Sequence, residues 1–388
     1  MPDNNFQKKR IWTISAAHFF HDIYPAFFAP VLPLLISKFG LSLAAAGSLD
    51  IARKLPSLMT PLIGYIADRK PVKYFIIATP AVTAASMSLL GTAENYPIAV
   101  ILLFFAGLST NCFHVPAPVI VKYFAGPKVK KGMSYFMSAG AIAGTVGTFT
   151  ITMTIAYLGF EKSWILMFPG ILISIILFFR FRDISKLHPN TLVQTKNKLH
   201  STKSFIPFFI ILIIVMFFRA AMTLAFTLYL PVYLIQKGTS LQLAGLSLSL
   251  LHLSGAAGMI ITGKFSDKVS SAKMISVLLI LSAASMWTFI NMTENFFFSS
   301  ILLVIQGFVM FSISPLLLAL VQHLKSKRPA FVNSIYFTLG FIVNTIGVIL
   351  LGICGDIFGL QNTFEICSIL PLLSIPFVFL LSKSKHSK

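Results

Sequence analysis

The chain has 388 residues, of which 56% are hydrophobic and only 11% are charged. Soluble globular domains carry about 25% charged residues, so this composition excludes an ordinary soluble domain. The formal net charge of +20 is in the range of nucleic-acid-binding proteins, but the placement of the basic residues along the chain favours another explanation.

Twelve apolar runs, separated by short polar breaks, are each long enough to cross a membrane as a helix. A helix of about 20 residues spans a hydrocarbon core of about 30 Å. Twelve such spans use most of the chain, so no separate soluble domain is expected. The predicted spans are 11–38, 43–66, 73–92, 97–122, 132–157, 160–181, 205–236, 240–265, 272–292, 296–320, 330–353 and 361–382.

Basic residues gather on one side of this predicted topology. Of the 31 Lys and Arg residues, 25 lie in the two tails and in the loops on their side, and three lie inside spans. Only Lys38, Lys162 and Lys237 lie on the opposite side. Cytoplasmic loops carry such an excess, so both termini are predicted to be cytoplasmic. The charge therefore indicates membrane topology and contact with anionic lipid, and no nucleic-acid partner is expected.

The first apolar run is interpreted as a retained helix. It follows Lys8-Lys9-Arg10 as a signal peptide would, but it is long, contains ionisable residues and shows no clear small-residue cleavage site. The three cysteines are Cys112, Cys354 and Cys367, and they form no CxxC pair. They predict neither a disulfide framework nor a thiolate metal site.

Asp22 lies near the middle of the first predicted span, after His18 and His21. An ionisable side chain at membrane depth costs about 2.5–3.5 kcal/mol on insertion scales, and it usually faces a cavity or a partner. A carboxylate between burial and an aqueous cavity can bind and release a proton. Asp22 is therefore either a proton carrier or the anion of a structural pair, and the sequence leaves both open.

The second predicted span carries Asp50, Arg53 and Lys54. Asp50 is three residues before Arg53 and four before Lys54, so all three share one helical face and can pair locally. One positive charge remains after pairing. It is expected either to balance Asp22 or to bind an anionic substrate group, which the guanidinium of Arg53 suits.

Two charged loops are copies of one another. "GYIADRKPVKYF" (64–75) and "GKFSDKVSSAKM" (263–274) each place an Asp four residues after a Gly. A shift of about 199 residues also aligns 33–47 with 231–245 and several single residues. These pairs are Gly107 with Gly307, Pro116 with Pro315, Ser134 with Ser334, Gly140 with Gly340, and Gly147 with Gly347.

An even number of spans separates the two copies, so they share one orientation. The predicted organisation is an N-terminal six-helix half (1–181), a basic cytoplasmic linker (182–204) and a C-terminal six-helix half (205–388). The same shift places Arg219, in the seventh span, over His21 in the first. Both halves are therefore expected to place an ionisable group at matched depth.

His114, in the fourth span, fits a proton relay, a substrate hydrogen bond or a packed structural histidine. The fifth span contains Gly140, Gly144 and Gly147, a pattern that favours close helix packing. Pro25, Pro30 and Pro33 in the first span, and Pro231 in the seventh, predict kinks. No His, Asp or Glu cluster has the spacing of a metal site.

The chain resembles members of the major facilitator superfamily. Gly64-x-x-x-Asp68-Arg69 matches the loop signature of that superfamily, and the 263–268 copy matches its degenerate echo. More narrowly, the chain resembles the fosmidomycin-resistance efflux proteins over nearly its whole length. This resemblance is carried by 18–35, 61–71, 107–114, 233–245 and 366–380. The family pattern continues Phe-His with a Pro-Glu pair and an Arg, and this chain lacks that acid and that Arg after Phe113-His114.

The resemblance implies an all-α membrane protein with twelve transmembrane helices in two parallel repeats, and a substrate site near the midplane. It implies a secondary transporter working by alternating access, with Gly64, Asp68 and Arg69 in a gating loop. We expect proton-coupled efflux of a small amphiphilic or anionic compound. The alternative is proton-coupled import of an organic anion.

The candidate substrate-binding and coupling residues are Asp22, Arg53, Arg219, His114, Asp50, Lys54 and His21. Neither a catalytic triad nor a Walker motif is present in the sequence, so neither an enzyme nor a self-contained ATP-driven pump is expected. We expect a monomer in the inner membrane that uses the proton gradient and needs no cofactor.

Overall fold

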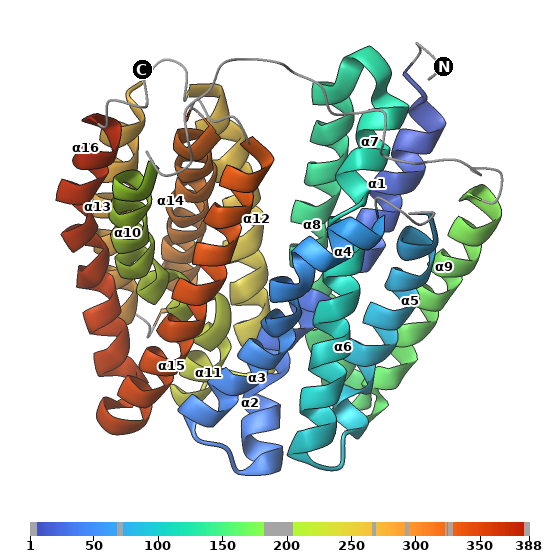
Figure 1. The fold of residues 1–388 in the computed structure, drawn as a ribbon. Coiled ribbons are helices and arrows are strands. Elements are labelled where there is room, and N and C mark those ends of the chain that lie inside the picture. Colours follow the sequence, from blue (N-terminus) through green and yellow to red (C-terminus); the bar gives the residue numbers. More distant parts are fainter. Residues whose placement is uncertain are drawn as a thin grey trace. The chain divides into compact units, whose positions relative to one another are not determined.

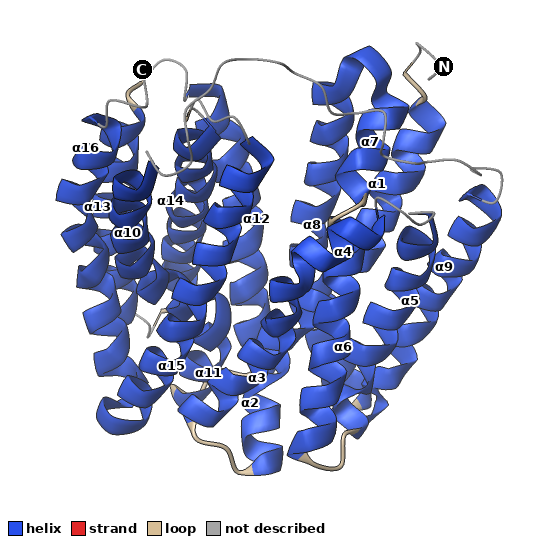
Figure 2. Ribbon diagram, in the orientation of Figure 1, coloured by secondary structure: helices blue, strands red, loops and turns tan. Residues whose placement is uncertain are grey.

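The computed structural model describes residues 6–67, 73–181, 205–265, 269–291, 295–322, 324 and 329–383. All regular elements in these ranges are helices (Figure 2). The described helices form two compact units. Unit 1 comprises Met1–Gly40, Leu49–Gln194 and Ser240–Ser249, and unit 2 comprises Leu41–Ser48, Thr195–Thr239 and Leu250–Lys388. The predicted linker 182–204 lies outside the described residues.

Unit 1 is built from the first group of helices, labelled in Figure 1. They are α1 (Lys8–Asp22), α2 (Phe28–Phe39), α4 (Thr60–Ala67), α5 (Lys73–Ser88), α6 (Tyr96–His114), α7 (Ala117–Ala125), α8 (Val129–Leu158) and α9 (Met167–Phe181). Within it, α5 packs against α6 and α9, and α1 packs against α8. Buried apolar side chains, among them Ile14, Phe113, Phe124 and Phe136, form a hydrophobic core within it.

Unit 2 contains α10 (Ile206–Leu224), α11 (Leu230–Gln236), α13 (Ser271–Asn291), α14 (Phe296–Gln322), α15 (Pro329–Ile369) and α16 (Ile375–Lys383). Here α13 packs against α14, and α10 packs against α15 and α16. Two helices, α3 (Leu43–Lys54) and α12 (Leu241–Phe265), each have their first residues in one unit and the rest in the other.

Ten segments of the described chain are long and apolar enough to cross a membrane, against twelve predicted spans. The predicted span 43–66 is not among them because Asp50, Arg53 and Lys54 interrupt it. The last two predicted spans appear as one segment, Ile335–Leu381, because α15 continues across a kink at Gly359, whose φ is 79°. The difference between ten observed and twelve predicted spans therefore comes from the charged residues of 43–66 and from the merging of the last two spans.

The predicted span 97–122 is wrong as one continuous helix. The chain forms α6 and α7 with a break at Val115 and Pro116. Pro116 has no backbone N–H to donate, and its ring clashes with the preceding turn. The break leaves His114 as the last residue of α6.

Of the predicted kinks, the one at Pro25 is confirmed by a break in the helix. A 3₁₀ turn starting at Pro25 separates α1 from α2, and Pro33 lies inside α2. A π-helical turn, Ala225–Tyr229, precedes the helix that contains Pro231. The first of these breaks ends α1 at Asp22, so the carboxylate lies at a helix end.

The repeat is visible as the same close packing inside each unit. A Cβ added at Gly107 would lie 1.7 Å from the Arg53 carbonyl oxygen, and one at Gly307 would lie 2.2 Å from the Leu251 carbonyl oxygen. Both distances exclude any side chain. Each glycine therefore lets the fourth helix of its repeat pack directly on the backbone of the second helix.

Leu41–Ser48 is grouped with unit 2, and Ser240–Ser249, its counterpart in the repeat, is grouped with unit 1. In unit 2, Gly352 packs against Ala44, and the Asp356 carboxylate accepts hydrogen bonds from the backbone N–H groups of Leu43 and Ala44 at 2.7 and 3.0 Å. In unit 1, Gly245 packs against Thr152. The first turn of α3 is thus capped by an acid from α15, which suits the positive end of the helix.

Replacing Asp356 with Ala removes this cap and leaves two backbone N–H groups of α3 without their acceptor. We expect a loss of about 1 kcal/mol of stability, as for other lost N-terminal caps. The apparent melting temperature of the purified protein should fall. Asp356→Asn, whose side-chain oxygen still accepts, should fall less, and equal losses for both variants would contradict the capping role.

Candidate functional site

Four ionisable side chains meet inside unit 1 at the ends of α1 and α6. His18 and Asp22 are four residues apart on one face of α1, His21 precedes Asp22, and His114 ends α6. We call this group the Asp22 cluster. His21 and His114 both lie in the last turn of their helices, where the helix dipole favours positive charge.

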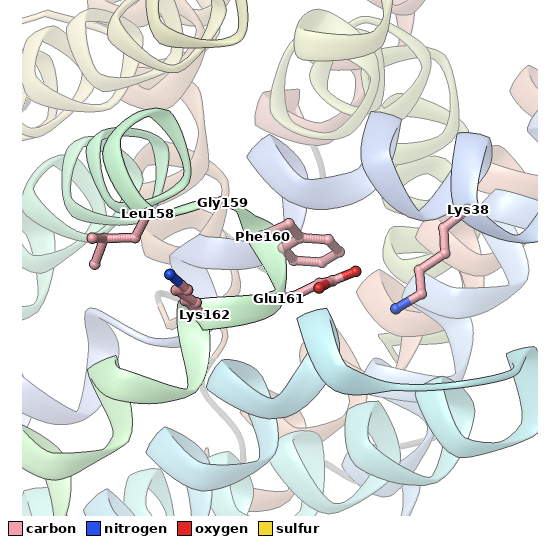
Figure 3. A pocket seen from close by; sticks show the side chains of 6 residues that line it. All are labelled: Lys38, Leu158, Gly159, Phe160, Glu161 and Lys162. Carbon is pink, nitrogen blue, oxygen red and sulfur yellow. The ribbon is translucent and has the colours of Figure 1, made fainter.

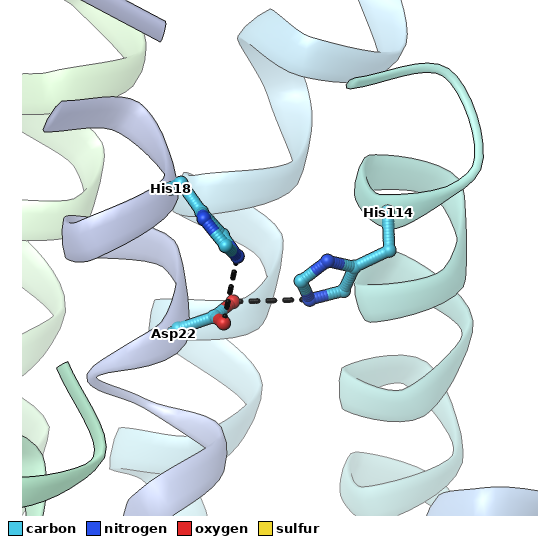
Figure 4. A group of neighbouring side chains, drawn as sticks. All are labelled: His18, Asp22 and His114. Carbon is cyan, nitrogen blue, oxygen red and sulfur yellow. Dashed lines mark ion pairs between the residues drawn. The ribbon is translucent and has the colours of Figure 1, made fainter. Parts of the chain in front are cut away.

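All three imidazoles contact the one carboxylate. His18 Nε2 lies 3.0 Å from Asp22 Oδ2, and His21 Nδ1 lies 2.9 Å from Oδ1. His114 Nε2 reaches Oδ1 from the other helix at 3.1 Å (Figure 4). Every ion pair of Asp22 in the described chain is therefore with a histidine, and the surplus charge of Arg53 and Lys54 does not pair with it there.

Aromatic rings hold the two buried imidazoles in place. His18 stacks on Phe136 with ring centroids 3.9 Å apart, and His21 stacks on Phe113 at 4.4 Å. His18 and His21 are 4% and 0% exposed, so their rings have little room to rotate. The side chains of Asp22 and His114 are 21% and 38% exposed, which leaves one side of the cluster open.

The hydrogen on His18 is assigned by its backbone partner. His18 Nδ1 lies 2.7 Å from the carbonyl oxygen of Phe136, which can only accept, so Nδ1 donates. In a neutral imidazole Nε2 then carries only a lone pair. That lone pair faces Asp22, and an ionised carboxylate also only accepts. The contact therefore needs one further proton, on His18 or on Asp22.

The hydrogen on His21 is assigned through a chain of hydroxyl groups. Ser109 donates its only hydroxyl hydrogen to the Thr79 carbonyl at 2.9 Å, so the 2.8 Å contact between Thr83 and Ser109 uses the hydrogen of Thr83. His21 Nε2 must then donate to the Thr83 hydroxyl, 3.0 Å away. His21 Nδ1 thus also faces Asp22 with a lone pair unless a second proton is added.

The cluster consequently has the arrangement of a proton-binding group. Two of its three contacts each require a proton beyond those of neutral imidazoles and an ionised carboxylate. The sequence identified His21, Asp22 and His114 as candidates, and the structure brings all three together. The structure also adds His18, which the sequence could have identified by its four-residue spacing from Asp22. It further adds Thr83, Ser109 and Phe136, for which no pattern in the sequence indicated a place in the cluster.

Gly140 provides the space for this cluster from α8. A Cβ there would lie 2.4 Å from His18 Cε1 and 3.1 Å from Asp22 Oδ2. Gly147, on the same helix, approaches the carbonyl oxygen of Ile23, with an added Cβ at 2.2 Å. The glycine pattern therefore packs α8 against the first helix, and Gly140 does so beside the polar group.

Gly140→Ala should displace His18 and destabilise unit 1. Extra methyl groups in packed interiors cost about 1–3 kcal/mol, and the neighbouring ring cannot bend away. Gly340→Ala is the matched control, because its Cβ would meet only the flexible end of Met216 at 3.3 Å. Thermal unfolding of both purified variants tests this, and a similar loss for both would contradict it.

A second charged group, predicted from its spacing, is confirmed on α3. The Asp50 carboxylate is 2.6 Å from both Arg53 Nη2 and Lys54 Nζ, and Asp50 is only 1% exposed. The guanidinium also lies over the Phe28 ring, 5.1 Å from its centroid. These contacts leave the trio with one net positive charge within unit 1.

Arg219 lies on α10 in unit 2. In the described part of the chain it makes no ion pair, and its guanidinium donates a long hydrogen bond of 3.5 Å to the Thr223 hydroxyl. Its buried Nε has no partner. A guanidinium left this poorly satisfied at membrane depth is suited to an anionic ligand.

The predicted gating residues are only partly described. Gly64 belongs to α4, whereas Asp68 and Arg69 lie outside the described residues. A surface pocket of about 360 Å³ lies elsewhere in unit 1 (Figure 3). It is lined by Lys38, Leu158, Gly159, Phe160, Glu161 and Lys162, none of which is a predicted site residue.

Comparison with known proteins identifies the family. The model of the Major Facilitator Superfamily matches residues 14–347, so the chain belongs to that superfamily. The fosmidomycin resistance protein of Escherichia coli (strain K12) is 25% identical over 375 residues, covering 95% of this chain and 91% of that protein. The uncharacterized MFS-type transporter YfnC of Bacillus subtilis (strain 168) is 23% identical, covering 93% and 90%.

Solved structures show the same fold. An inward-facing, occupied bacterial homolog of the human lysosomal transporter Spinster has a TM-score of 0.81 at 15% identity, covering 98% of this chain and 97% of that one. A D-xylose-proton symporter has a TM-score of 0.76 at 12% identity, covering 98% and 100%. The chain is therefore a multi-pass membrane transporter of the twelve-helix major facilitator fold, and not an enzyme.

Proposed function

We propose that this protein exports a small amphiphilic or anionic compound in exchange for protons, by alternating access. The observation that carries the proposal is the Asp22 cluster, where three imidazoles surround one carboxylate inside a spanning bundle. The export direction is supported by likeness to the fosmidomycin resistance protein. We further propose that the chain acts as a monomer, without a cofactor, in the inner membrane with both termini cytoplasmic.

In this proposal Asp22 carries the coupling proton and the histidines stabilise its two protonation states. The open side of the cluster, formed by Asp22 and His114, gives water a route to the carboxylate. His18 and His21 are held from behind by a carbonyl and a hydroxyl chain. A proton gained or lost at Asp22 therefore changes the hydrogen bonds between α1 and α6, which is how protonation would bias a conformational change.

The substrate anion is proposed to bind Arg219 and not the Asp50, Arg53 and Lys54 trio. Arg219 is the stronger candidate because both cations of the trio already contact a carboxylate. Guanidinium binds carboxylate or phosphonate with two parallel hydrogen bonds, and an apolar neighbourhood strengthens them. The loop containing Gly64, Asp68 and Arg69 is proposed as the gate, by its match to the superfamily signature.

Import of an organic anion with protons is the second candidate. It is supported by the structural likeness to a D-xylose-proton symporter and to a POT family transporter in complex with 5-aminolevulinic acid, which has a TM-score of 0.78 at 13% identity. The direction is tested by accumulation of radiolabelled phosphonates and carboxylates, fosmidomycin included, in cells with and without the protein. Export predicts lower accumulation that a protonophore restores; higher accumulation would favour import.

Asp22→Asn should abolish proton-coupled transport while preserving the fold, because the amide keeps the shape but cannot exchange a proton at this position. In everted vesicles, substrate should no longer release the imposed pH gradient, as followed by a pH-sensitive dye. His252→Ala, a histidine of unit 2 outside the cluster, is the control. Normal coupled flux in Asp22→Asn would overturn the assignment of the proton carrier.

Arg219→Ala should weaken substrate binding, raising KM by about tenfold to a hundredfold, which corresponds to the loss of one charge-assisted contact. Arg219→Lys should recover part of the loss, because lysine keeps the positive charge but lacks the planar guanidinium group that makes two parallel hydrogen bonds. Uptake into vesicles at graded substrate concentration separates KM from the maximal rate. An unchanged KM in both variants would remove Arg219 from the substrate site.

A further inference from the structure

The Asp22 cluster also has the ligand types of a transition-metal site. His18 Nε2, His114 Nε2 and a carboxylate oxygen of Asp22 all lie within 4.8 Å of one another. Figure 4 shows both rings pointing their Nε2 atoms at the carboxylate, from α1 and from α6. Imidazole and carboxylate together are the ligands of Zn²⁺ and its neighbours in the first transition row.

The spacing of these atoms can be compared with that of a tetrahedral site. Metal–ligand distances of about 2.0–2.1 Å in a tetrahedron place neighbouring ligand atoms about 3.3 Å apart. Here His18 Nε2 lies 3.0 Å from Asp22 Oδ2 and His114 Nε2 lies 3.1 Å from Asp22 Oδ1, and one ligand atom from each of the three residues lies within 4.8 Å of the others. Binding an ion therefore requires these atoms to rearrange around it, and Asp22 and His114 are the two more exposed side chains.

His18 and His21 have the outer contacts that metal ligands need. A ligating imidazole donates its other N–H to a carbonyl or carboxylate, which fixes the tautomer with a lone pair toward the metal. His18 does this through Nδ1 and the Phe136 carbonyl. His21 is fixed in the same sense through Thr83, so its Nδ1 lone pair also points at Asp22.

These lone pairs require positive charge between the rings and the carboxylate. The contacts of His18 and His21 with Asp22 need two further protons, or one divalent cation that carries the same total charge as those two protons. A divalent cation among His18, Asp22 and His114 would satisfy the lone pair of His18, and that of His21 as well if His21 Nδ1 is its fourth ligand. Mg²⁺ and Ca²⁺ prefer all-oxygen ligand sets, so this nitrogen-rich group selects transition metals.

We propose that the Asp22 cluster binds one divalent transition-metal ion of the Zn²⁺ class, with His18 Nε2, His114 Nε2 and the Asp22 carboxylate as ligands. A fourth position is left for water or His21 Nδ1, as in open zinc sites. The exposed edge of Asp22 and His114 is the entry path. Binding follows from the ligand geometry alone and does not require the proposed transport activity; if that activity is proton-coupled, the metal competes with its protons.

Co²⁺ is the probe, because its visible absorption bands report the number and type of ligands. The full-length protein is purified with a tag that contains no histidine, and Cys112, Cys354 and Cys367 are replaced by Ser to remove thiolate sites. Titration should show one saturable equivalent of Co²⁺ with nitrogen and oxygen ligands, displaced by Zn²⁺. Mg²⁺ in large excess should not displace it.

Variants then locate the site. Asp22→Asn and His114→Ala should each lose saturable binding, whereas His252→Ala should bind like the parent. His21→Gln should weaken binding by about 10–100-fold, the usual effect of removing an outer contact to a ligand. Size-exclusion profiles and melting temperatures show whether each variant is folded. If His114→Ala does not fold, the test rests on Asp22→Asn, which changes the shape of the side chain least.

Two results would overturn the proposal. One is the absence of a saturable Co²⁺ equivalent in the folded parent protein. The other is binding that persists in folded Asp22→Asn, which would place the ion at another histidine of the chain. Because the measurement involves no substrate, a failure of metal binding leaves the transport proposal to its own experiments.

Discussion

The contact of one carboxylate with three imidazoles, inside a helix bundle, is the interaction around which unit 1 is arranged. Asp22 at membrane depth is costly without partners, and burying a charge is tolerated only when hydrogen bonds and opposite charge satisfy it. The break before Pro25 puts it at a helix end, the break before Pro116 does the same for His114, and Gly140 leaves space on the third side. Three separate backbone features thus serve one polar group.

The six-helix repeat provides the frame for this arrangement. Gly107 and Gly307 allow the same helix-to-backbone contact in the two units, although only unit 1 develops the histidine and carboxylate group in the described chain. Unit 2 instead carries Arg219, a cation without an ion pair among the described residues. The two units of the repeat therefore differ in their ionisable side chains, with a histidine and carboxylate group in one and an arginine in the other.

Sequence reasoning recovered the features that local rules control. The helical class, the pairing of Asp50 with Arg53 and Lys54, and the break at Pro25 follow from hydropathy, residue spacing and backbone chemistry. The family followed from the resemblance of the chain to the motifs of that superfamily. Errors arose where such rules compete: the span 97–122 was expected to be continuous, but Pro116 divides it. The exchange of Leu41–Ser48 and Ser240–Ser249 between the units was not predicted, because it depends on packing between distant helices.

The sequence by itself determined that this is a helical membrane protein, since a bilayer admits few solutions for a chain this apolar and its helices are encoded locally. That it is a transporter followed from the resemblance of its motifs to those of the major facilitator superfamily. Only the tertiary structure decided that His18, His21, Asp22 and His114 form one site. His114 is 92 residues from Asp22, and the orientation of each ring depends on Phe136, Thr83 and Ser109 from other helices. Hydrogen positions in such a group follow from all partners at once, and no spacing along the chain contains that information.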